Sequence, residues 1–211
     1  MTDNISAPHF RRMLEAARTR IREQHETLSR LDAAVGDGDH GTTMLRAMDA
    51  AAQAASQHPD AGLQQLLSAA GWAVMACDGG STGPLLGSWF LGMSEAAAGR
   101  AELDVPALAA VFESGVAKLQ KQSRAQIGDK TMMDALLPAV AALKAADPGQ
   151  GVTAALAQAA EAAARGAADT ANMRAKFGRA RHLGDRVLGH PDPGAVSVSL
   201  IFRGFGEGLV A

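Results

Sequence analysis

Hydrophobic residues recur at helical spacing along almost the whole chain. From about Pro8 to Leu31, apolar side chains return every three or four positions, which is typical of an amphipathic helix packed on a core. Ser6 is a suitable N-cap for this segment, and Pro8 occupies a permitted first-turn position. Further helices are expected at about residues 42–57, 63–77, 130–147, 152–174 and 193–209. Another opens at Pro84, and one capped by Asp104 carries apolar residues as far as Leu119.

The pattern predicts an all-α fold of eight helices in one domain spanning residues 1–211. Most connections are short, so the helices are expected to be antiparallel. The segment Val196-Ser197-Val198-Ser199 alternates like a strand, but a lone strand would have no partner, so helix is expected there too. Hydrophobic residues make up 47% of the chain and aromatics 4%, which favours helices packed closely through alanine.

Charge and cysteine content exclude several classes of protein. The formal net charge of −2 provides no basic surface, so a nucleic acid partner is not expected. Cys77 is the only cysteine, which rules out an internal disulfide and fits a cytoplasmic location. The N-terminal residues lack the features of a secretory signal, and no apolar run is long enough for a membrane span.

The loop after the first helix is rich in aspartate and glycine. Asp32, Asp37 and Asp39 fall within eight residues, and clustered carboxylates suit a hard divalent cation such as Mg²⁺. The alternative is a simple turn, because Asp-Gly pairs favour turns on their own. An EF-hand is excluded, since Thr42 and Met48 stand where that loop requires Gly and Glu.

Two further glycine-rich segments precede helices. Residues 79–84 and 189–195 each lead into a helix N-terminus, where free N–H groups and the helix dipole favour anions. Neither is a Walker A loop, and each has an ordinary capped turn as its alternative. Neither zinc ligand spacing nor a nucleophile elbow occurs. The residues alone therefore indicate a helical protein that binds a metal and a phosphorylated ligand at one end.

The order of these motifs resembles that of the nucleotide-binding L subunit of dihydroxyacetone kinase, over almost the whole chain. This resemblance implies a closed barrel of eight antiparallel helices, with ADP or ATP and two Mg²⁺ ions bound at one end. The motifs that carry it are Asp32 with residues 37–41, then residues 79–84, 128–134, 183–186 and 189–195.

The resemblance also implies roles for individual residues. Asp32, Asp37 and Asp39 would hold the two Mg²⁺ ions. Thr43 stands where the family commonly has Asn, and Ser123 where it often has Gly. The implied nucleotide contacts are His40, Gly41, Thr42, Thr43, Ser81, Thr82, Met132, Arg179, Asp192, Pro193 and Gly194.

By the same resemblance, the chain is expected to be the nucleotide-binding part of a kinase that needs a ketone-binding partner subunit, with no catalytic residue assigned in this chain. A phosphohistidine protein of the phosphotransferase system would recharge bound ADP in the coupled form, which is favoured, whereas ATP would exchange in the other form. Two alternatives stay open: an ATP-dependent kinase subunit for an erythrulose-like tetrose, and a non-catalytic regulator that binds nucleotide on the same scaffold.

Overall fold

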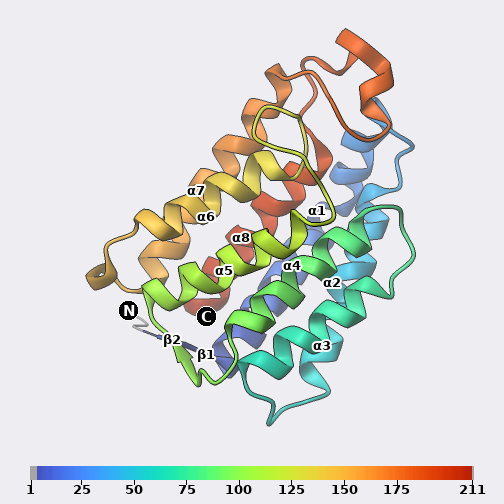
Figure 1. Cartoon of the computed structure of the whole chain (residues 1–211). Coiled ribbons are helices and arrows are strands. Elements are labelled where there is room, and N and C mark those ends of the chain that lie inside the picture. Colours follow the sequence, from blue (N-terminus) through green and yellow to red (C-terminus); the bar gives the residue numbers. More distant parts are fainter. Residues whose placement is uncertain (1–3, 211) are drawn as a thin grey trace.

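The structure is a computed structural model that describes residues 4–210, and these residues are mostly helical (Figure 1). The prediction of an all-α fold is therefore confirmed. Short 3-10 segments occupy Pro148–Gln150, Thr170–Asn172 and Ala180–Val187. The α-helices are α1 (Ala7–Val35), α2 (His40–Ser56), α3 (Leu63–Met75), α4 (Thr82–Ala96), α5 (Val105–Leu119), α6 (Met133–Ala145), α7 (Val152–Asp169) and α8 (Pro193–Val210).

Local chemistry explains where several helices begin. The Asp104 side chain accepts a hydrogen bond from Ala107 N at 2.9 Å and so caps α5, while the N–H of Ser6 donates to His9 at the start of α1. Helix α6 begins at Met133 rather than near Lys130, as the sequence had suggested. The cause is the backbone of Lys130, whose φ of 59° is incompatible with a right-handed helix.

A minimal sheet was not predicted. The two-residue strands β1 (Ile5–Ser6) and β2 (Glu102–Leu103) pair antiparallel, with Ile5 opposite Leu103. Two residues are too short for an alternating pattern, so no local signal could have revealed the pair.

Neighbouring helices in the chain pack on each other from α1 to α8, and α8 packs back on α1. The middle of the core is aromatic, although aromatic residues are rare in this chain. The Trp89 and Phe205 rings stack with centroids 6.3 Å apart, and Phe112 meets Trp89 edge-on. Much of the remaining core is alanine, in line with the expectation of close packing between helices.

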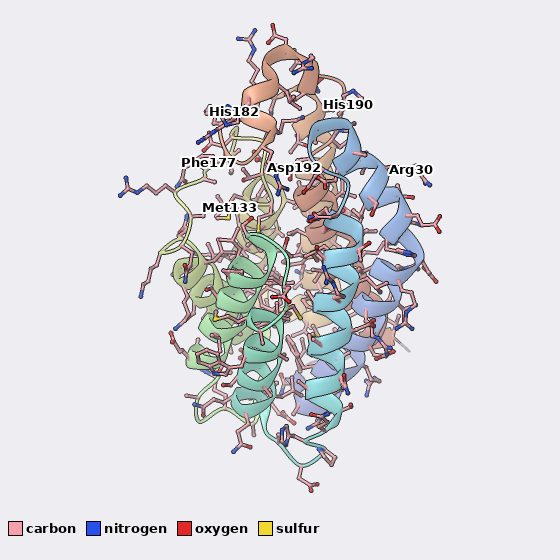
Figure 2. The ribbon with its side chains drawn as sticks, turned by 90° about the vertical axis from the view of Figure 1, so that its right-hand side faces the viewer. Arg30, Met133, Phe177, His182, His190 and Asp192 are labelled. Atoms are coloured by element: carbon pink, nitrogen blue, oxygen red, sulfur yellow. The ribbon has the colours of Figure 1, made fainter. Side chains whose placement is uncertain are left out.

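The connections that follow α1, α3, α5 and α7 all contribute to one cavity. The long segment between α7 and α8, coloured orange in Figure 1, lies at the end away from the marked termini. Figure 2 shows Met133, Phe177, His190 and Asp192 gathered towards that end. Successive helices that reverse direction bring alternate connections together, so motifs distant in sequence become neighbours. Among residues 4–210, no helix combines the length and apolar character needed to cross a bilayer.

Candidate metal and nucleotide site

The cavity has a volume of about 440 Å³ and is lined by residues within 32–44, 79–86, 119–133 and 177–201. That volume lies in the usual range for small-molecule sites, roughly 300–1,000 Å³. Its wall has three chemically distinct parts: a carboxylate cluster, the start of a helix and an apolar surface.

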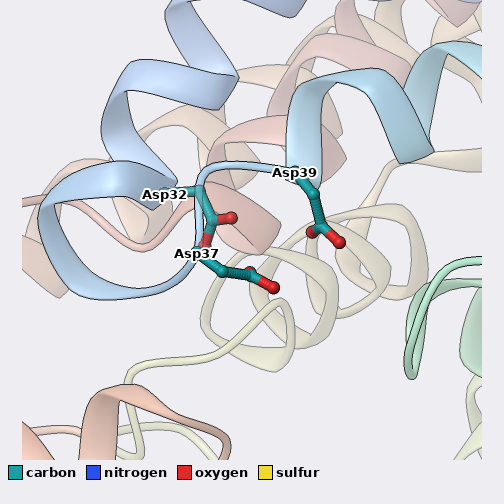
Figure 3. A group of neighbouring side chains, drawn as sticks. All are labelled: Asp32, Asp37 and Asp39. Atoms are coloured by element: carbon teal, nitrogen blue, oxygen red, sulfur yellow. The ribbon is translucent and has the colours of Figure 1, made fainter.

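The carboxylate cluster consists of Asp32, Asp37 and Asp39, as predicted from the sequence (Figure 3). One carboxylate oxygen from each residue lies within 4.8 Å of the others. Gly38 makes this convergence possible, because its φ of 80° turns the chain between the two exposed aspartates. Three oxygens at this spacing suit a hard divalent cation.

Helix stability explains these carboxylates only in part, although Asp32 accepts a hydrogen bond from the first N–H of α2. Asp32 lies in the last turn of α1, where the helix dipole disfavours a negative charge. Asp39 precedes α2 but makes no side-chain capping hydrogen bond. A bound cation would compensate both features, so the cluster fits a metal better than it fits a simple turn.

Two contacts hold the cluster in the present structure. The N–H of His40 donates to the Asp32 carboxylate at 3.2 Å, and Arg179 Nη1 lies 2.5 Å from Asp37 Oδ1. Of the arginines in the segment before α8, Arg179 is thus the one that reaches the cluster. Arg181 and Arg186 instead contact His182 and the carbonyl of Leu183.

His40 joins the start of α2 to α8. Its Nε2 lies 2.7 Å from Ser197 Oγ, and Ser197 donates its single hydroxyl proton to Pro193 O at 2.9 Å. Nε2 therefore carries a proton and donates it to the Ser197 hydroxyl. Burial lowers the pKa of His40, while the Asp32 and Asp39 carboxylates oppose that change. The ring acts as an uncharged connection beside the metal site.

The two glycine-rich helix starts differ. At α4, Ser81 makes no side-chain cap, which leaves the first N–H groups of the helix available for an anion. At α8, the Asp192 carboxylate accepts a hydrogen bond from Ala195 N at 2.7 Å. The α8 start is therefore the capped turn that the sequence analysis had kept as an alternative, although Asp192, Pro193 and Gly194 do line the cavity.

The third part of the wall is apolar. Met132 packs partly buried beside the start of α8, where a Cβ placed on Gly194 would lie 3.5 Å from Met132 Cβ. Further apolar side chains of this wall come from α4, α5, α6 and α8, and their role was not identified from the sequence. They are Leu85, Leu86, Leu119, Met133, Val198 and Ile201. A flat base would fit against such a surface.

Three residues implied by the resemblance do not line the cavity: Gly41, Thr42 and Thr43. Gly41 allows α2 to approach α1, because a Cβ there would lie 1.8 Å from His25 O. Thr42 is exposed and Thr43 is buried. The Thr43 side chain packs under the glycine-rich loop, since a Cβ on Gly79 would lie 2.3 Å from Thr43 Cγ2.

Sequence reasoning also missed Lys130, a buried residue of the cavity wall. It was visible only as part of the segment 128–134, where a lysine stands among acidic residues in a loop that opens with glycine. Ser123, noted as a departure from the family pattern, does line the cavity.

Replacing Asp192 by asparagine is expected to change how stability depends on pH. Burial raises the pKa of Asp192 to about 7, against the opposing effects of Ala195 N–H and the Lys130 ammonium group. The folded state therefore binds an extra proton between about pH 4 and 7, and the wild type loses stability as pH rises through that window. Asparagine cannot ionise, so the variant gains relative to wild type by up to about 1.4 kcal/mol per pH unit. Urea unfolding at several pH values measures this difference, and parallel curves would contradict it.

The sequence model of the DAK2 domain matches residues 34–207. The chain belongs to the DAK2 domain family. The PEP-dependent dihydroxyacetone kinase 1, ADP-binding subunit DhaL, of Listeria innocua is 36% identical over 184 residues, which cover 87% of both chains. The corresponding ADP-binding subunit DhaL of Escherichia coli K12 is 33% identical over 181 residues, covering 85% of this chain and 86% of that relative.

A solved structure extends the comparison to the fold. The dihydroxyacetone kinase from C. freundii in complex with AMP-PNP and Mg²⁺ matches with a TM-score of 0.71 and 28% identity. The match covers 92% of this DAK2 chain but only 33% of that kinase. The resemblance read from the order of the motifs is thus confirmed, and the chain corresponds in extent to the bacterial ADP-binding subunits.

Proposed function

We propose that this DAK2 domain is the nucleotide-binding subunit of a dihydroxyacetone kinase and transfers a phosphoryl group from a magnesium nucleotide to a short-chain ketone held on a partner subunit. One observation carries the proposal: the carboxylate cluster, the uncapped start of α4 and an apolar wall meet in one cavity. These surfaces suit metal, phosphate and base respectively. The names of the two bacterial relatives and the nucleotide complex of the C. freundii kinase support it.

In this proposal the three aspartates hold two Mg²⁺ ions, which would neutralise the phosphate charge when bound. The backbone N–H groups of Ser81 and Thr82 donate hydrogen bonds to a phosphate oxygen. Arg179, which pairs with Asp37, would contact the phosphates of a bound nucleotide through its guanidinium.

The remaining residues position the nucleotide. Gly41 and Thr42 lie outside the cavity lining and would act by shaping the start of α2, while Thr43 packs against the glycine-rich loop. His40 keeps the α2 start fixed against α8. The base lies against the cavity wall formed by Met132 and residues 192–194. Phosphoryl transfer needs little covalent chemistry from the protein, so positioning and charge neutralisation supply the catalysis.

The phosphotransferase-coupled form is our preferred version, in which ADP stays bound and a phosphohistidine protein recharges it. The two relatives quoted above are both named PEP-dependent ADP-binding subunits, and this chain spans most of their length. By contrast, it spans only a third of the C. freundii kinase.

We also infer that residues 1–211 form a single nucleotide-binding domain with the family's closed barrel of eight antiparallel helices. The packing of α8 on α1 supports closure of the ring. The shared cavity of the four connections supports alternating helix directions.

ADP with Mg²⁺ is expected to raise the thermal unfolding midpoint clearly. A ligand at 100 times its dissociation constant adds about 2.7 kcal/mol of stability, which corresponds to roughly 5–10 °C for a domain of this size. Differential scanning fluorimetry with ADP, Mg²⁺, both together and both with EDTA measures the effect. EDTA should reverse most of it. An unchanged midpoint with every adenine nucleotide, in protein shown by mass spectrometry to carry none, would overturn the proposed function.

A further inference from the structure

Lys130 combines two unfavourable features that call for an explanation. Its side chain is 2% exposed, so a charged ammonium group is buried. Its φ of 59° places a long side chain in the left-handed region, and no other non-glycine residue within 4–210 has a positive φ. Strained backbone of this kind tends to persist at functional sites.

The ammonium group of Lys130 connects two ends of the segment between α7 and α8. Its Nζ donates to Thr170 O and to His190 O, each at 2.5 Å. Thr170 lies directly after α7, and His190 lies two residues before Asp192. The Thr170 hydroxyl in turn accepts a hydrogen bond from Asp192 N at 2.8 Å. One lysine thus fixes both ends of the segment next to the start of α8.

The loop that carries Lys130 is itself held from α6. The buried Asp134 carboxylate accepts hydrogen bonds from Gly128 N at 2.6 Å and from Thr131 N at 2.7 Å. Lys130 therefore stands between a fixed loop and the start of α8, with its charge near both Asp134 and Asp192. Met132, two residues further on, belongs to the same cavity wall.

We propose that Lys130 is a positioning residue of the nucleotide site: its ammonium group holds the Asp192–Gly194 start of α8 against Met132 and supports the Asp192 carboxylate as the cap of α8. This inference rests on the proposed function, because the ligand that it helps to position is the nucleotide. Lys130 acts through Asp192 and the backbone carbonyls, and the proposal gives it no contact with the transferred phosphoryl group.

Asp192 lies between one positive and one negative side chain. The charged groups that face Asp192 are Lys130 from the loop before α6 and Asp134 from α6 itself, while Ala195 N–H from α8 donates to it. Removing the ammonium group leaves two carboxylates close together with no cation between them. The pKa of Asp192 then rises further, and its cap on α8 weakens at neutral pH.

Three substitutions separate charge from backbone effects. Lys130→Met keeps the alkyl chain and removes the charge, Lys130→Gly relieves the backbone strain and also removes the charge, and Lys130→Arg keeps the charge. Titration calorimetry with ADP and Mg²⁺ at pH 7 should show affinity lowered roughly 10-fold to 100-fold in the first two, with substantial rescue in the third. Lys144→Met is the matched control, because Lys144 is an exposed lysine on α6 paired with Glu113.

The pH profile provides a measurement that a purely structural role would not move. As pH is lowered and Asp192 is protonated, ADP affinity should fall. In Lys130→Met the midpoint of this fall should lie at a higher pH than in wild type, and raising the pH should restore binding. When Asp192→Asn is added to both the wild type and Lys130→Met, their pH profiles should no longer differ, because no carboxylate remains at residue 192 to titrate.

The outcomes distinguish this inference from the proposed function. Wild-type protein that binds no adenine nucleotide overturns the function. Wild type that binds ADP, with folded Lys130→Met showing the same affinity and the same pH midpoint, overturns only the role of Lys130. If neither Lys130→Met nor Lys130→Gly folds by circular dichroism, Asp192→Asn alone decides: a pH profile identical to wild type overturns the inference, and a flattened profile supports it.

Discussion

Replacing Asp37 or Asp39 by alanine is expected to abolish Mg²⁺-dependent nucleotide binding while the helices stay intact. Substitution of groups that merely support metal ligands often costs 10–100-fold, so the loss of a ligand itself should weaken binding by at least about 100-fold. Asp39 makes no capping hydrogen bond, and Asp37 loses only an exposed ion pair with Arg179. Removing one of three clustered carboxylates also relieves repulsion, so the unfolding midpoint without ligand should be unchanged or raised. Calorimetric titration beside circular dichroism measures both effects.

Asp60→Ala is the matched control for these variants. Asp60 is an exposed aspartate in the connection between α2 and α3, outside the lining of the cavity. Its replacement should leave nucleotide affinity and its dependence on EDTA at wild-type values. Wild-type affinity in both Asp37→Ala and Asp39→Ala would mean that the loop is only a turn, and the metal site would have to be abandoned.

The helices were predictable because each one has its own apolar spacing and end residues within a short stretch of sequence. Apolar spacing located α1 and α5, and the cap at Asp104 was recognised from its residue type alone. Helix was correctly expected at residues 196–199, where alternation suggested a strand but no partner strand was available. The start of α6 was placed too early because the left-handed backbone of Lys130 depends on tertiary contacts that a periodic pattern does not contain.

The site was predictable only where its residues are close together in sequence. Asp37 and Asp39 lie on one loop and Asp32 lies in the helical turn just before it, so their convergence followed from spacing. The apolar wall draws one or two residues from each of α4, α5, α6 and α8, and each of those residues has the spacing of an ordinary core position. Sequence spacing could not distinguish Thr43, which faces inward under a loop, from a residue that faces a ligand.

The purified chain with ATP and Mg²⁺ is expected not to phosphorylate dihydroxyacetone or erythrulose on its own, and the cognate ketone-binding subunit should restore transfer. The cavity offers metal ligands, a helix start and an apolar wall, which a nucleotide would occupy. The His40 ring lines the cavity but is engaged with Ser197, and the exposed His190 is not part of the lining. Without a group that holds the ketone in line with the phosphoryl donor, the positioning that supplies much of the rate is missing.

The surface beside the cavity predicts how this restored activity responds to salt. Within residues 173–190 the exposed basic side chains are Arg174, Lys176, Arg179, Arg181 and Arg186. A transient complex that forms at this end should be sensitive to ionic strength, because exposed charges are screened beyond about 10 Å at 0.1 M salt. A coupled assay of turnover against added subunit, repeated at rising salt, measures both effects, with Asp37→Ala as the inactive control and Asp60→Ala as the active one. Full turnover by this chain alone would overturn the two-subunit proposal and require a ketone site within the chain itself. If only the partner subunit restores turnover, and Asp37→Ala abolishes it, the phosphoryl donor is assigned to the carboxylate cluster.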